Sequence, residues 1–77
     1  MNRKLENSEI KKHVGNILGA QRLAKNYSLQ AVASDLKISK STLSEIENGV
    51  YNLSIDLLMK IASYYGLETA EIFSLQG

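Results

Sequence analysis

The sequence contains no cysteine and no proline, and its one histidine is His13. Disulfides are therefore excluded, and so is a zinc site with four Cys or His ligands. No apolar run approaches the roughly 18–20 residues of a membrane span, and no apolar stretch follows the charged N-terminus as in a secretory signal. We therefore expect a soluble cytoplasmic protein that uses no metal or cofactor and makes no membrane contact.

Other classes of function lack support as well. No Ser/His/acid grouping suggests nucleophilic catalysis, because no acidic residue is evident that would orient His13, which we expect at the surface. No glycine-rich loop of the kind that binds phosphates is present. We therefore do not expect an enzyme.

A chain of 77 residues is expected to form one domain. A domain this short buries only about 60% of the surface that its unfolded chain exposes, so its stability is marginal. With no disulfide or metal to help, it needs an economical helical core, a partner subunit, or both.

Charge is unevenly distributed although the net charge is only +1. Residues 1–25 contain six Lys and Arg against two acids, whereas residues 26–77 contain three Lys against six acids. The basic N-terminal third could face phosphate groups. Charge alone favours the simpler interpretation, which is a solvated helix face.

Apolar residues recur with helical spacing in five segments, at about 9–25, 29–36, 40–47, 55–65 and 69–73. Four of these segments follow a serine that can cap a helix, namely Ser8, Ser28, Ser39 and Ser54. Residues 1–7 are polar and are expected to be flexible. No segment has a strand pattern, so the sequence predicts an all-α fold of five short helices.

Two glycines, Gly15 and Gly19, interrupt the first predicted helix with a spacing of four. Each weakens the helix by roughly 1 kcal/mol relative to alanine. We therefore expect a neighbouring element to approach this helix closely at the two glycines.

The stretch from Ser28 to Gly49 is the most informative part of the sequence. It predicts two helices of about two turns with a very short link, in which Ala33 allows a close crossing and Ile38 fills the angle. Leu43 and Ile46 point inward, which leaves a small and polar outer face on the second helix. A helix of this kind can enter the DNA major groove, which is about 12 Å wide.

This pattern resembles the phage-repressor/Cro-like helix-turn-helix family, also called the XRE family, over about residues 13–73. The resemblance is carried by Val32-Ala33, Ile38-Ser39, Ser41-Thr42-Leu43-Ser44, Ile46-Glu47-Asn48-Gly49, Ile61-Ala62 and Gly66-Leu67. It implies a compact five-helix lambda-repressor-like DNA-binding domain over residues 8–77. The helix-turn-helix would lie at about 28–49, and the part at about 54–75 would dimerise.

The resemblance also implies roles for individual residues. Base edges would be contacted by Lys40, Ser41, Ser44 and Glu45. Phosphates would be contacted by Ser28, Thr42, Asn48, Tyr51 and Asn52. Arg22 and Glu47 match a partly buried ion pair that links the first helix to the end of the recognition helix.

A regulator of this type is expected to bind double-stranded DNA as a homodimer that reads an inverted repeat, because one recognition helix contacts too few base pairs for specificity. The dimer interface is predicted to include Tyr64, Phe73 and Leu75. Tyr64 could instead lie at the edge of the core. No small-molecule effector is indicated.

Two departures from the family pattern support an alternative function. Leu29 occupies a position where the family often has a glutamine that reaches the DNA backbone, and the loop at 50–53 is neutral where the family is often basic. The alternative is a protein-interaction module, such as an antitoxin or anti-repressor, that has kept the fold.

Overall fold

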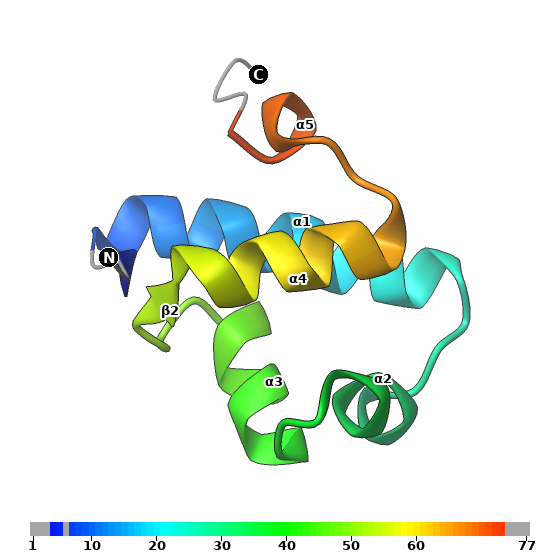
Figure 1. Cartoon of the computed structure of the whole chain (residues 1–77). Helices are drawn as coiled ribbons and strands as arrows, with labels where there is room; N and C mark the ends of the chain where they lie inside the picture. Colours follow the sequence, from blue (N-terminus) through cyan, green and yellow to red (C-terminus); the bar gives the residue numbers. More distant parts are fainter. Residues whose placement is uncertain (1–3, 6, 74–77) are drawn as a thin grey trace.

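The computed structural model describes residues 4–5 and 7–73 (Figure 1). Five α-helices form this part of the chain, together with a short two-stranded pairing. The all-α architecture is confirmed. The elements in chain order are β1 (Lys4–Leu5), α1 (Ser8–Ala24), α2 (Leu29–Leu36), α3 (Lys40–Glu47), β2 (Leu53–Ser54), α4 (Ile55–Tyr65) and α5 (Thr69–Phe73).

Serine side chains begin three of the helices as predicted. The hydroxyls of Ser28, Ser39 and Ser54 each accept a hydrogen bond of 3.0 Å from the backbone N–H three residues later. Each bond satisfies a donor that the first helical turn leaves without a partner. The starts of α2, α3 and α4 are thereby fixed at the predicted residues.

The start of α1 differs from the prediction, because its cap is Asn7 and Ser8 is already helical. The Asn7 side-chain oxygen accepts hydrogen bonds of 3.0 Å from the N–H groups of Glu9 and Ile10. Asparagine caps helices as well as serine does, so the preceding residue competes successfully for these donors.

A short antiparallel pairing joins β1 to β2, with Lys4 opposite Ser54 and Leu5 opposite Leu53. The sequence predicted no strand, so the structure differs from the prediction at Lys4 and Leu5. Strands of two residues are too short to show the alternation by which a sequence predicts a strand.

The helices surround one hydrophobic core. α1 and α4 lie side by side, with α2 and α3 on one side of them and α5 on the other (Figure 1). Burial of each large apolar side chain contributes about 1.5–3 kcal/mol. The largest fully buried side chains are Val14, Leu18, Val32, Leu43, Leu58, Ile61 and Ile72.

The predicted close approach at the glycines of α1 is confirmed, and the approaching element is the end of α3. A Cβ atom on Gly15 would lie 2.5 Å from the carbonyl oxygen of Ile46 and 2.7 Å from that of Glu47. A Cβ atom on Gly19 would lie 3.3 Å from the Glu47 carboxylate. These contacts set how α3 packs against α1.

None of the helices in residues 4–5 and 7–73 is long and apolar enough to cross a membrane.

Candidate nucleic-acid interface

The link between α2 and α3 is short because α2 ends in a left-handed residue. Lys37 has φ +61°, and its N–H bonds to the carbonyl oxygens of Ala33 and Ser34. The N–H of Ile38 also donates to Ala33, at 3.0 Å, and Ser39 then caps α3. Because only three residues separate the two helices, α3 begins directly beside the end of α2. The N-terminus of α3 remains at the surface.

The outer face of α3 carries the four side chains that the resemblance assigns to base edges. Lys40, Ser41 and Glu45 are exposed and Ser44 is half-buried, while Leu43 and Ile46 are buried on the opposite face. The four outer residues and Leu29 of α2 line an open hollow of about 470 Å³. The hollow therefore presents an ammonium group, two hydroxyls and a carboxylate to whatever occupies it.

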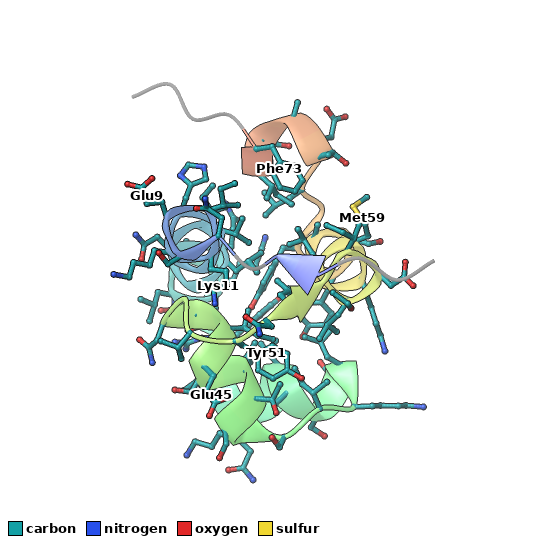
Figure 2. The ribbon with its side chains drawn as sticks, turned by 90° about the vertical axis from the view of Figure 1, so that its left-hand side faces the viewer. Glu9, Lys11, Glu45, Tyr51, Met59 and Phe73 are labelled. Carbon is teal, nitrogen blue, oxygen red and sulfur yellow. The ribbon has the colours of Figure 1, made fainter. Side chains whose placement is uncertain are left out.

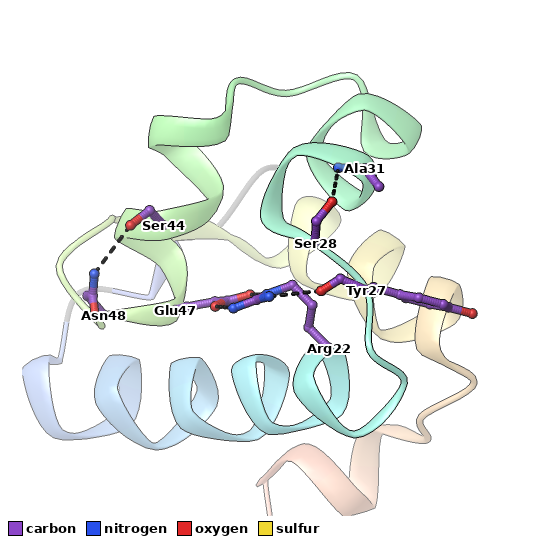
Figure 3. Close-up of polar contacts among 7 residues, drawn as sticks. All are labelled: Arg22, Tyr27, Ser28, Ala31, Ser44, Glu47 and Asn48. Atoms are coloured by element: carbon purple, nitrogen blue, oxygen red, sulfur yellow. Dashed lines mark hydrogen bonds and ion pairs between the residues drawn. The ribbon is translucent and has the colours of Figure 1, made fainter.

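The predicted phosphate contacts Ser28, Thr42 and Asn48 lie at the ends of the two helices. The exposed Ser28 hydroxyl accepts from the N–H of Ala31 at 3.0 Å. The Thr42 hydroxyl accepts from Ser39 at 2.8 Å, and the Asn48 amide donates to Ser44 at 3.4 Å (Figure 3). These bonds orient the three side chains at the ends of α2 and α3.

The loop after α3 lies against the basic N-terminal half of α1. The Lys11 ammonium donates to the side-chain oxygen of Asn52 at 2.9 Å. A Cβ atom on Gly49 would lie 2.7 Å from the Cα of Lys12. α1 therefore supplies the positive charge that the loop sequence lacks.

Sequence reasoning did not identify Lys11 as a residue of this surface. Lys11 and Asn52 are 41 residues apart in the chain, so their contact depends on how α1 and α3 pack. The basic balance of residues 1–25 was the available signal, and charge alone favoured a solvated helix face.

Arg22 and Glu47 form a bidentate ion pair between the ends of α1 and α3 (Figure 3). The Arg22 Nε donates to Glu47 Oε2 at 2.8 Å and Nη2 donates to Oε1 at 3.1 Å, while Nη1 donates to the Tyr27 carbonyl at 2.9 Å. The two side chains are 13% and 12% exposed. The hydrogen bond with Glu47 raises the pKa of Arg22 further above its ordinary value. The pair thus fixes the orientation of α3 with charged groups that are largely removed from water.

Tyr64, predicted at a dimer interface, also has partners within its own chain. Its hydroxyl donates to the Asp35 carboxylate at 2.7 Å, which links α4 to α2. This hydrogen bond is the main reason that the pKa of Tyr64 is raised to about 12. The ring makes edge-to-face contacts with Tyr27 and Tyr65, at centroid distances of 6.3 Å and 5.2 Å.

Tyr65 is a buried residue whose hydroxyl has no hydrogen-bond partner among the residues that the structure describes. Burial raises the pKa of Tyr65 to about 12, and the nearby Glu47 carboxylate adds to the shift. The hydroxyl is therefore a source of instability close to the Arg22–Glu47 pair.

The C-terminal helix α5 lies on the far side of α1 and α4 from α2 and α3 (Figure 1). Ile72 is buried, whereas the neighbouring Phe73 is 39% exposed. The half-buried His13 of α1 bonds through Nε2 to the Ile72 carbonyl at 3.1 Å, so His13 anchors α5 and is not the surface histidine that we expected. Leu75, the third predicted dimer residue, lies outside the described residues.

No cluster of metal ligands occurs in residues 4–5 and 7–73.

Comparison with known proteins identifies relatives of this arrangement. The family model Helix-turn-helix (HTH_3) matches residues 18–72. The HTH-type transcriptional regulator SlrR of Bacillus subtilis is 36% identical over 64 residues, which is 82% of this chain and 42% of that protein. An uncharacterized HTH-type transcriptional regulator of Methanocaldococcus jannaschii is 34% identical over 58 residues, which is 75% of this chain and 88% of that protein. The chain thus spans less than half the length of SlrR.

A solved structure has the same fold. The crystal structure of the clp gene regulator ClgR from Corynebacterium glutamicum superposes with a TM-score of 0.76 and 27% sequence identity. The match covers 82% of this chain and 67% of that chain.

Proposed function

Because the chain belongs to the XRE-type helix-turn-helix family, we propose that it binds double-stranded DNA sequence-specifically and regulates transcription. One observation carries this proposal. α3 buries Leu43 and Ile46 and turns a stripe of short polar side chains outward, beside a helix N-terminus that is free to approach a groove. A helix with this division of faces can lie in the major groove with its first residues against base edges.

The outer residues of α3 supply the chemistry of readout. Lys40 is suited to donate to the O6 and N7 acceptors of guanine, and Glu45 to accept from the amino group of cytosine. Ser41 and Ser44 can donate or accept. Each good bidentate contact to a base contributes about 1–3 kcal/mol of discrimination.

Phosphate contacts position the protein on the duplex. Backbone N–H groups at the starts of α2 and α3 point outward and favour anions. The side chains that we assign to phosphate are Ser28, Thr42, Asn48, Tyr51 and Asn52. We add Lys11, whose ammonium lies 2.9 Å from the side-chain oxygen of Asn52 and brings positive charge to the loop after α3.

We further propose that the protein acts as a homodimer on an inverted repeat. Two copies would place their recognition helices in successive major grooves about 34 Å apart. Phe73 and Met59 are large apolar side chains that are 39% and 42% exposed, so a partner subunit could bury them. Phe73 lies on the side away from α3, so a partner there leaves α3 accessible (Figure 2).

Selection of bound sites from a random DNA pool tests the proposal. We expect an inverted repeat whose half-sites are about one helical turn apart, and a dimer in gel filtration. The double variant Lys40→Ala, Ser41→Ala should relax the selected sequence while its thermal unfolding stays close to that of the wild type, because both side chains are exposed. A monomer without preference over random DNA would contradict the proposal.

A protein-interaction module is the second candidate, and the apolar Leu29 on the proposed DNA face favours it. Under this alternative the chain would bind a protein partner and no DNA. Purification in complex with one stoichiometric protein, together with failure to select any DNA site, would support it over the first proposal.

A further inference from the structure

Leu29 differs in chemistry from its neighbours in the hollow. Of the five described side chains that line the hollow, Leu29 alone is apolar. It is the first residue of α2, directly after the Ser28 cap, and it is half-buried because part of its side chain packs against the hydrophobic core. The remaining apolar surface is held in a fixed position facing the groups of α3.

The side chain of Leu29 is not suited to phosphate, although the backbone at the start of α2 is. The Leu29 side chain has no donor, so a phosphate bound by the backbone N–H groups at the start of α2 would gain no hydrogen bond from this side chain. The outer residues of α3 line the same hollow. When α3 lies in the major groove, as proposed above, base edges occupy this space.

Among base edges in the major groove, thymine is the one standard base that presents an apolar group, its C5-methyl, next to the acceptor O4. The hollow presents an apolar surface at Leu29 beside the donors Lys40 and Ser41. We propose that Leu29 is a specificity-determining residue that packs against the methyl group of a thymine in each half-site, while Lys40 or Ser41 donates to its O4. This inference rests on the proposed DNA-binding function.

The methyl group itself does not distinguish thymine from 5-methylcytosine. Next to its methyl, however, 5-methylcytosine carries an amino donor where thymine carries O4. The ammonium of Lys40 faces the same hollow and cannot accept from that amino group, whereas the Glu45 carboxylate and the serine hydroxyls of the hollow can. Thymine is the occupant that we propose, because its O4 suits the donors Lys40 and Ser41, and a 5-methylcytosine duplex tests this choice.

The test uses the site selected from the random pool and duplexes in which deoxyuridine replaces thymine at one position at a time, which removes the methyl group alone. The wild type should bind the thymine duplex about fourfold more tightly than the deoxyuridine duplex at one position per half-site, as expected for burial of one methyl group. In Leu29→Ala and Leu29→Gln this ratio should fall to near one. The control variant Leu23→Ala, which removes a leucine that is 64% exposed and does not line the hollow, should keep the ratio.

Several results would overturn the inference while the proposed function stands. They are a selected site without thymine in the half-sites, a ratio near one for the wild type, an unchanged ratio in both Leu29 variants, or equal binding of a 5-methylcytosine duplex. Failure of the wild type to select any DNA sequence would instead overturn the proposed function and this inference together. Melting curves show whether each variant is folded, and Leu29→Gln keeps the side-chain length should Leu29→Ala fail to fold.

Discussion

Replacing Glu47 by alanine should destabilise the domain far more than an exposed charge would. The substitution leaves the Arg22 guanidinium, which is 13% exposed, without its carboxylate partner. Removal of one member of a buried pair costs about 3–5 kcal/mol, and an exposed pair contributes about 0.2–1 kcal/mol. The two side chains are only 13% and 12% exposed, so the loss should lie closer to the value for a buried pair than to that for an exposed pair. We expect Glu47→Ala to lower the free energy of unfolding by about 2–3 kcal/mol. A domain of this length has about 4–12 kcal/mol in total.

Urea unfolding followed by circular dichroism measures this loss, with Glu45→Ala as the matched control. Glu45 lies on the same helix and carries the same charge, but it is exposed. We expect its replacement to change the free energy of unfolding by less than about 0.5 kcal/mol. The difference between the two variants isolates the contribution of burial and pairing.

A double variant, Arg22→Met with Glu47→Leu, tests the cause of the loss. Because it removes both charges and keeps apolar volume, it should recover most of the stability that Glu47→Ala loses. If Glu47→Ala costs no more than Glu45→Ala, the ion pair does not hold α3 against α1 and the reasoning is refuted.

Three further predictions concern single residues. Gly15→Ala should lower the free energy of unfolding by about 1–3 kcal/mol, because its Cβ would lie 2.5 Å from the Ile46 carbonyl oxygen; urea unfolding that shows a more stable variant would contradict this. Tyr65→Phe should raise the free energy of unfolding by about 1 kcal/mol at neutral pH, since it removes a buried hydroxyl that has no partner in the described structure. Wild-type stability should also fall as the pH rises from 10 to about 12, because unfolded tyrosine ionises first, and the Phe variant should lose less; equal losses in the two proteins would argue against a raised pKa at Tyr65. Lys11→Ala should reduce the slope of log binding constant against log salt concentration by about 1.8 on the selected site, because the proposed dimer loses one phosphate contact in each protomer at about 0.9 per contact. An unchanged slope would place Lys11 away from the DNA.

The helices could be predicted from the sequence because their signals are local. Ser28, Ser39 and Ser54 cap the helices that follow them, and Gly66 ends α4 with φ +73°. Each signal acts within a few residues, so apolar periodicity and capping residues together predicted where α2, α3 and α4 begin and end. α1 is the exception, since Asn7 and Ser8 are adjacent residues that can both cap, and the Asn7 side chain accepts from the first-turn N–H groups.

The contacts that shape the candidate site depend on distant parts of the chain. The sequence predicted a small-residue face at Gly15, but that the end of α3 fills it follows only from the fold. The pairing of Arg22 with Glu47 was implied by family resemblance and could not be worked out from the residues alone. Lys11 was missed because its contact with Asn52 requires α1 to pass the loop after α3. Leu29 was noted as a departure, and its place in the hollow was visible only in the structure.

The central claim is that the outer face of α3 touches base edges in the major groove. Methylation interference on the selected site tests it most directly, because dimethyl sulfate modifies guanine at N7 in the major groove and adenine at N3 in the minor groove. We predict that guanine methylation within the half-sites prevents binding by the wild type, and that adenine methylation there does not. Interference by adenine methylation without any effect of guanine methylation would contradict the claim.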